Sequence, residues 1–148
     1  MIDVSGKGTV VREAIAEGEI KLRKETLRLI REGRVEKGDP LGIAKVAGIN
    51  GSKLTPLLIP LCHNIPIEYS EVTFELLEDG IRARATVRTT AKTGVEMDAL
   101  TSVAVALLNL WDVVKKYEKD ESGQYPDTEI RRIRVVSKVK GDASGGRA

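Results

Sequence analysis

Lysine side chains stand beside loops or helix ends at three places where a phosphate could bind. Lys37 and Lys92 each come shortly before a glycine, and Lys53 ends a segment rich in small residues. The N-terminus of a helix offers free N–H groups and a positive partial charge, and a lysine adds a mobile cation. Each lysine could equally be a solvated surface side chain. Glu96 and Asp98 could likewise be ordinary acids in the first turn of a helix.

A carboxylate and an amine three residues apart form a second candidate. Asp112 and Lys115 follow an apolar run and share one face of a predicted helix. They are either a partly buried ion pair or a general base and a general acid, with pKa values shifted by burial and by each other's charge. The only histidine, His63, is either a loop residue bonded to the backbone or a proton-transfer group, because both of its forms exist near neutral pH.

Two familiar kinds of site can be excluded. Gly6 and Lys7 lack the earlier glycine of a Walker phosphate loop, because Gly6 lies too near the start of the sequence. Cys62 and His63 are the only cysteine and histidine, and a tetrahedral zinc site within one chain needs more ligands. We therefore expect no metal site and no resident cofactor.

Length and composition limit the class of protein. The 148 residues, 41% hydrophobic and 31% charged, predict one domain over residues 1–148, with residues 1–8 and 141–148 flexible. The net charge of +2 shows no bias toward polyanions, and 3% aromatic residues disfavour a surface that stacks nucleic-acid bases. A single cysteine, no signal-like N-terminal pattern and no long uncharged apolar run favour a cytoplasmic protein without a membrane segment.

Hydrophobic periodicity and capping residues predict the elements that must position these groups. Strands are predicted over residues 19–23, 72–76, 81–87 and 130–138, with a tight turn at 78–80 and a charged loop at 118–127. Helices are predicted over residues 9–17, 24–32 and 96–115, and after an Asp39 N-cap with a restart at Thr55. Five small residues between 42 and 51 predict close approach by another element. This order predicts an α+β fold, a sheet with helices on one face.

The long helix sets the distance between the candidate groups. A core face is predicted from Leu100, Val103, Leu107, Leu110, Trp111 and Val114, with Asp98, Thr101, Asp112 and Lys115 on the opposite, polar side. At about 1.5 Å per residue, Glu96 and the pair formed by Asp112 and Lys115 lie about 20 Å or more apart. They can serve one small-molecule site only if neighbouring subunits bring them together.

Four blocks of sequence, spread over nearly the whole chain, resemble one known family. They are residues 2–7 (IDVSGK) with Val11, Arg12 and Glu13; residues 37–39 with Ala47, Gly48 and Ile49; residues 58–63 (LIPLCH); and residues 93–100 (TGVEMDAL) with Asp112 and Lys115. The chain is similar in these blocks to the cyclic pyranopterin monophosphate synthases, the molybdenum cofactor biosynthesis protein C family. It departs from the usual family pattern at Leu54, at Asn64, at Asp98, where the family has glutamate, and in the segment after Lys138.

The resemblance implies a fold, an activity and an assembly. The fold would be ferredoxin-like, and the enzyme would be a lyase that converts (8S)-3',8-cyclo-7,8-dihydroguanosine 5'-triphosphate to cyclic pyranopterin monophosphate and pyrophosphate. The assembly would be a homohexamer, a trimer of dimers with sites at the dimer interface. No nucleic acid or membrane would take part, and Mg²⁺ could accompany the triphosphate.

The resemblance also assigns residues to the pocket. It places Lys37, Asp112 and Lys115 in the pocket, and our hypothesis for the mechanism makes Lys37 and Lys115 the acids and Asp112 the base. The predicted substrate-binding residues are Asp3, Arg12, Lys53, Cys62, His63, Lys92, Glu96, Met97, Asp98 and Lys138. The same hypothesis puts Lys53, Lys92, Arg12 and Lys138 on the phosphates, and Glu96 and Asp98 on the polar edge of the pterin.

Two other readings of the sequence stay open. One is a non-enzymatic oligomeric module that binds nucleotides or RNA through Arg82, Arg84 and Arg88, which share one face of the predicted hairpin. The other is a different nucleotide-processing enzyme on the same fold, which would release pyrophosphate from ordinary GTP.

Overall fold

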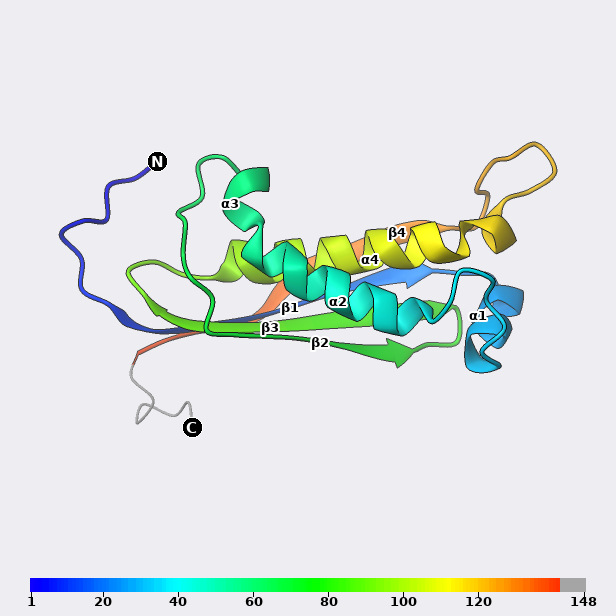
Figure 1. Cartoon of the computed structure of the whole chain (residues 1–148), viewed down its shortest axis with the longest axis horizontal. Helices are drawn as coiled ribbons and strands as arrows, with labels where there is room; N and C mark the ends of the chain where they lie inside the picture. Colours follow the sequence, from blue (N-terminus) through cyan, green and yellow to red (C-terminus); the bar gives the residue numbers. More distant parts are fainter. Residues whose placement is uncertain (142–148) are drawn as a thin grey trace.

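A computed structural model describes residues 1–141 as one antiparallel sheet covered on one face by helices (Figure 1). The strands are β1 (Val10–Lys21), β2 (Tyr69–Leu76), β3 (Gly80–Ala91) and β4 (Glu129–Lys140). The helices are α1 (Lys24–Arg31), α2 (Pro40–Lys53), α3 (Thr55–Leu58) and α4 (Glu96–Glu118). The predicted flexibility of residues 142–148, like most of the altered segment after Lys138, lies outside the described residues.

The sheet has the order β2-β3-β1-β4, and each neighbouring pair is antiparallel. With helices between β1 and β2 and again between β3 and β4, this is the ferredoxin-like arrangement of an α+β fold. The predicted fold class is confirmed. The elements predicted from residue 24 onward are also confirmed, with strand and helix ends that differ by a few residues.

The prediction for the start of the chain was wrong. Residues 9–17 were expected to form a helix, and instead β1 runs unbroken through them and through the separate strand expected at 19–23. Alternate residues of β1 face the helices, among them the fully buried Ala14, Ala16 and Ile20. Alanine and glutamate favour a helix locally, but pairing with both β3 and β4 outweighs that preference.

Gly18 was expected to end that helix and instead lies inside β1. A Cβ atom added there would come within 2.8 Å of Val103 and 2.9 Å of both Leu107 and Ile133. Helix α4 and strand β4 therefore meet directly over this position, and only glycine leaves room for them.

Helix α4 is the core helix of the domain. It is long and apolar enough to cross a membrane, yet it packs against the sheet and against α2, and 56% of its most apolar stretch is buried. The small residues of α2 allow this packing, since a Cβ at Gly48 would lie 3.1 Å from Ala106 and one at Gly51 would lie 3.0 Å from Val105. The predicted close approach is confirmed.

Helix α2 buries part of the polar side of α4. Asp98 and Thr101, predicted on the polar side opposite the core face, are 1% and 8% exposed because α2 covers that side of α4. Asp39 does precede Pro40 as the N-cap residue of α2, but its side chain makes no capping hydrogen bond within the described chain.

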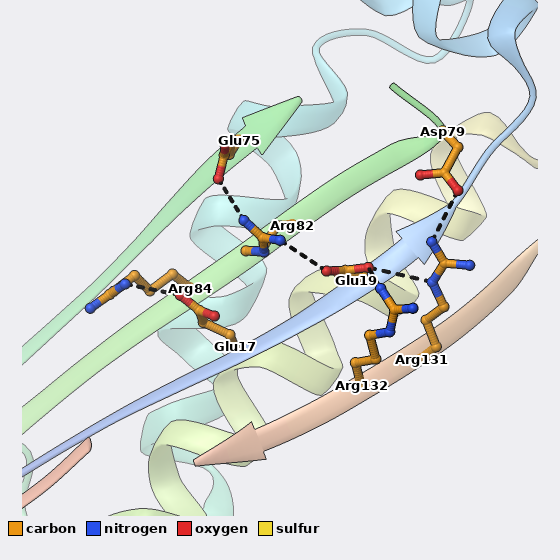
Figure 2. Close-up of polar contacts among 8 residues, drawn as sticks. All are labelled: Glu17, Glu19, Glu75, Asp79, Arg82, Arg84, Arg131 and Arg132. Carbon is orange, nitrogen blue, oxygen red and sulfur yellow. Dashed lines mark hydrogen bonds and ion pairs between the residues drawn. The ribbon is translucent and has the colours of Figure 1, made fainter. Parts of the chain in front are cut away.

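The sheet face away from the helices is charged and internally paired (Figure 2). Arg82 contacts Glu19 at 3.1 Å and Glu75 at 2.9 Å, and Arg131 and Arg132 also reach Glu19. Burial opposes ionisation of Glu19, but the hydrogen bonds from Arg82 and Arg131 outweigh it and hold its pKa below the usual range. Glu19 thus joins β1 to both of its neighbouring strands.

Candidate active site

The residues expected to do chemistry form two groups at opposite ends of α4. The group at the C-terminal end consists of Lys37, Asp112 and Lys115. The group at the N-terminal end consists of Asp3, Arg12, Lys53, Cys62, His63, Lys92, Glu96, Met97, Asp98 and Lys138.

At the C-terminal end, two lysines from different parts of the chain converge on Asp112. Lys115 Nζ lies 3.2 Å from Asp112 Oδ1, and Lys37 Nζ lies 3.4 Å from Oδ2 and donates to the Asp112 carbonyl oxygen at 3.0 Å. The hydrogen bonds from Lys115 and Lys37 lower the pKa of Asp112, so the carboxylate is ionised at neutral pH. A base between two ammonium groups can take one proton while a neighbouring lysine supplies another.

An aromatic wall that sequence reasoning missed stands beside this trio. Trp111 and Tyr125 meet edge to face, with ring centroids 5.2 Å apart. Together with Leu108, Asp112 and Lys115 they line an open hollow of about 370 Å³. The signal in the sequence was Trp111, the only tryptophan, placed directly before Asp112. Tyr125 comes from the charged loop after α4, and no pattern connects it to this position.

At the N-terminal end of α4, two basic residues from the sheet approach Glu96. Lys138 Nζ lies 2.8 Å from Glu96 Oε2. Arg12 is 6% exposed, donates from Nη2 to the Lys92 carbonyl oxygen at 3.2 Å, and has no partner for its Nε within residues 1–141. Strands β1 and β4 pair here, with Arg12 opposite Lys140 and Ala14 opposite Lys138, so all these side chains point to the helix side of the sheet. The cations suit phosphate oxygens.

Asp98 is a buried acid next to the loop cysteine. Its Oδ2 has no hydrogen-bond partner in the described chain, and burial raises its pKa to about 6 even though the Thr55 hydroxyl beside it acts in the opposite direction. Burial, followed by the charge of Asp98, raises the pKa of the Cys62 thiol, so the thiol stays protonated at neutral pH. Asp98 can therefore exchange a proton near neutral pH.

The Asp98 pKa predicts a pH-dependent cost to folding. The folded-state value of about 6 exceeds the ordinary 3.8, so the folded protein holds a proton that the unfolded chain releases between these values. Stability contributed by this group is present below about pH 4 and is lost as pH rises to about 6. We expect the free energy of unfolding of Asp98→Asn, relative to that of the parent protein, to rise by about 2–3 kcal/mol between pH 4 and pH 8. The measurement is urea unfolding at one protein concentration. Equal pH dependence of the two proteins would contradict the raised pKa.

The N-terminal segment before β1 lies over this end. His63 Nε2 is 2.6 Å from the Ile2 carbonyl oxygen, and Lys92 Nζ donates to the Ser5 carbonyl oxygen at 3.3 Å. Asp3 accepts a hydrogen bond from the Ser5 N–H at 2.8 Å, which lowers the Asp3 pKa. A hollow of about 440 Å³ lies beneath the segment, bordered in part by Val4, His63 and Lys92. The carbonyl oxygens of Ile2 and Ser5 thus hold the His63 ring and the Lys92 ammonium group, both of which could contact a substrate instead.

Two predicted residues are less closely joined to this group. Met97 is 40% exposed in the first turn of α4, and Lys53 is an exposed side chain at the last residue of α2, which runs antiparallel to α4. Among the described residues, no group of three histidine, cysteine, aspartate or glutamate side chains could hold a metal ion.

The two groups are separated by the length of α4. Glu96 and Asp112 lie sixteen residues apart on one unbroken helix, or about 24 Å along its axis. Their separation agrees with the distance expected from the sequence and is too large for one small molecule within a single chain.

Comparison with known proteins agrees with the motifs at both ends. A family model described as the MoaC family matches residues 1–141. The chain belongs to the MoaC family.

Curated relatives of this MoaC family member cover almost its whole length. A protein of Sulfolobus acidocaldarius is 59% identical over 140 residues, covering 95% of this chain and 98% of the relative. Proteins of Sulfurisphaera tokodaii and Thermococcus kodakarensis are 56% and 54% identical, covering 95% and 96% of this chain and 93% and 91% of the relatives. Each is named a probable cyclic pyranopterin monophosphate synthase. The resemblance read from the four sequence blocks is confirmed.

Proposed function

We propose that this protein is a cyclic pyranopterin monophosphate synthase, a lyase of molybdenum cofactor biosynthesis. It converts (8S)-3',8-cyclo-7,8-dihydroguanosine 5'-triphosphate to cyclic pyranopterin monophosphate with release of pyrophosphate. The observation that carries this assignment is the family match over residues 1–141, with relatives so named at 54–59% identity.

The trio at the C-terminal end of α4 supports an acid–base role in the ring rearrangement. Asp112 is the base, since Lys115 and Lys37 lower its pKa and so keep its carboxylate ionised and able to accept a proton. Lys37 and Lys115 are the acids, because protonation of a departing nitrogen or oxygen lowers the barrier to breaking its bond.

The group at the N-terminal end supports binding of the rest of the substrate. Arg12, Lys53, Lys92 and Lys138 bind phosphates and stabilise the charge that develops on the leaving pyrophosphate. Glu96 and Asp98 bind the polar edge of the heterocycle, with Met97, Cys62 and His63 beside them and Asp3 supporting the N-terminal segment. Mg²⁺ that arrives with the triphosphate would neutralise part of the negative charge on its phosphates.

We further propose that each complete site forms between two copies of the chain. The length of α4 supports this, because one small substrate cannot contact the residue groups at both ends of the same helix. Large apolar side chains are exposed on α2, on α3 and just after α3, including Val46 at 62%, Leu57 at 80% and Leu61 at 71%. Such a surface is typical of a protein–protein interface. A homohexamer built as a trimer of dimers places two composite sites in each dimer.

The nucleic-acid alternative is not favoured by the charged face of the sheet. Arg82, Arg84 and Arg88 do share that face, but each contacts a glutamate of β1 at 3.1 Å or less. Arginines already paired in this way have less positive charge to offer a phosphate backbone. The reducing conditions that suit a lone cysteine support a cytoplasmic location.

The deciding experiment supplies the purified protein with the cyclic dihydroguanosine triphosphate, with and without Mg²⁺. We expect equal amounts of pyrophosphate and cyclic pyranopterin monophosphate. GTP serves as the matched control nucleotide. Pyrophosphate from GTP, with none from the cyclic compound, would instead support a different nucleotide-processing enzyme.

A further inference from the structure

The segment that carries Lys37 is tied down on both sides of that residue. Val35 is 7% exposed and packs in the core, and the Gly38 N–H donates to the Val35 carbonyl oxygen at 3.2 Å. Gly38 has a φ of +126°, a conformation that favours glycine and turns the chain toward α2. Lys37 therefore projects from a short bend between α1 and α2, not from either helix.

Glu36, directly before Lys37, is held by two consecutive residues of α4. The Glu36 N–H donates to the Tyr117 hydroxyl oxygen at 2.8 Å. Lys116 Nζ lies 2.9 Å from Glu36 Oε1. One contact fixes the backbone and the other fixes the side chain, so the orientation of the bend relative to α4 is determined at this residue.

The same stretch of α4 is anchored to α1. Glu118 is fully buried, and its carboxylate accepts hydrogen bonds from the Arg23 N–H at 3.1 Å, from Thr26 Oγ1 and from Thr128 Oγ1 at 2.6 Å. Figure 1 shows α1, the bend and the end of α4 at the same end of the molecule. The residues that hold Glu36 are thus themselves part of a fixed framework.

We propose that Tyr117 is a positioning residue which, with Lys116, holds Glu36 so that the next residue, Lys37, stays in contact with Asp112. The catalytic consequence rests on the proposed function. Lys37 has a long, flexible side chain that is about half exposed. Its contacts with Asp112 alone restrict the motion of this side chain only weakly. Fixing the backbone one residue away reduces the volume that the ammonium group explores and raises the share of molecules ready to transfer a proton.

The test is Tyr117→Phe, which removes only the hydroxyl group. The bond is at the surface, so water can replace it and the fold should persist. We expect the Glu36 amide to exchange its hydrogen at least about threefold faster, measured by mass spectrometry on peptides covering residues 32–39. We expect kcat to fall about five- to tenfold with KM changed less than about twofold. Adding Lys116→Met should lower kcat further, because it removes the second contact.

Tyr69→Phe is the matched control, since Tyr69 lies on β2 and contacts Arg88 at the far edge of the sheet. It should leave kcat and exchange at residues 32–39 unchanged. Unchanged exchange in Tyr117→Phe would overturn the proposal, and so would faster exchange with an unchanged kcat. Inactivity of the parent protein would overturn the proposed function instead, and the exchange measurement would still test whether Tyr117 holds the bend.

Discussion

Lys115→Ala is expected to lower turnover of the cyclic dihydroguanosine triphosphate about 10²- to 10⁴-fold, the usual contribution of a positioned general acid. Lys115 Nζ lies 3.2 Å from Asp112 and its side chain is 43% exposed, so it can meet a substrate without being part of the core. The measurement is pyrophosphate release under saturating substrate. Because the lost interaction acts in the transition state, kcat should fall much more than KM rises.

Lys119→Ala is the matched control for this substitution. Lys119 follows the last residue of α4, is exposed, and lies four residues beyond Lys115. Its loss removes the same charge close to the site, and we expect turnover within about twofold of the parent protein because Lys119 is not among the cations of residues 1–141 in contact with Asp112, and an exposed charge without such a contact contributes little. Turnover of Lys115→Ala at the level of Lys119→Ala would remove Lys115 from the acid role.

Two inactive variants with lesions at opposite ends of α4 are expected to restore activity when assembled together. Lys115→Ala damages one end and Glu96→Ala the other. If each site combines the two ends from different copies, co-expressed chains in equal amounts leave about a quarter of the sites without a lesion. Pyrophosphate release should then recover to about a quarter of the parent rate, from a background near zero. Sites contained within one chain would give no recovery, because every chain carries one lesion.

The control for this mixture pairs Lys115→Ala with Lys37→Ala. Both lesions lie at the same end of α4, so no composite site is intact and no recovery is expected. Equal recovery in both mixtures would contradict a site shared in the proposed way. Size-exclusion chromatography of each variant, compared with the parent protein, checks that assembly itself is retained.

The helices and strands could be predicted from the sequence wherever the local residue pattern favours the same structure as the tertiary packing. The 78–80 turn between two alternating runs predicted β2 and β3, and small residues predicted the close packing of α2 on α4. Strand β1 could not be predicted, because Ala14, Glu17 and Gly18 suggest a helix and its end when considered alone. Their roles come from partners far along the chain, such as Arg84 opposite Glu17 and Leu107 over Gly18.

The candidate site shows the same division. Sequence blocks identified Asp112 and Lys115, and the helical spacing correctly placed Glu96 at a distance from them. The contact of Lys37 with Asp112 joins residues 75 positions apart, and no local pattern predicts it. Tyr117 was missed for the same reason, since its hydroxyl acts on a backbone N–H that has no signature in the sequence.

Helix α4 sets both the distance and the rotation between the residue groups at its two ends. Each added residue would lengthen it by about 1.5 Å and turn everything beyond by about 100°. One insertion between Glu96 and Asp112 would swing Asp112 away from Lys37 and push the aromatic wall out of line. The loop between α4 and β4 has no fixed rise per residue, although it keeps Tyr125 beside Trp111 and Thr128 beside Glu118. Divergence in chain length can therefore accumulate after Lys119, whereas the count of residues inside α4 must stay constant.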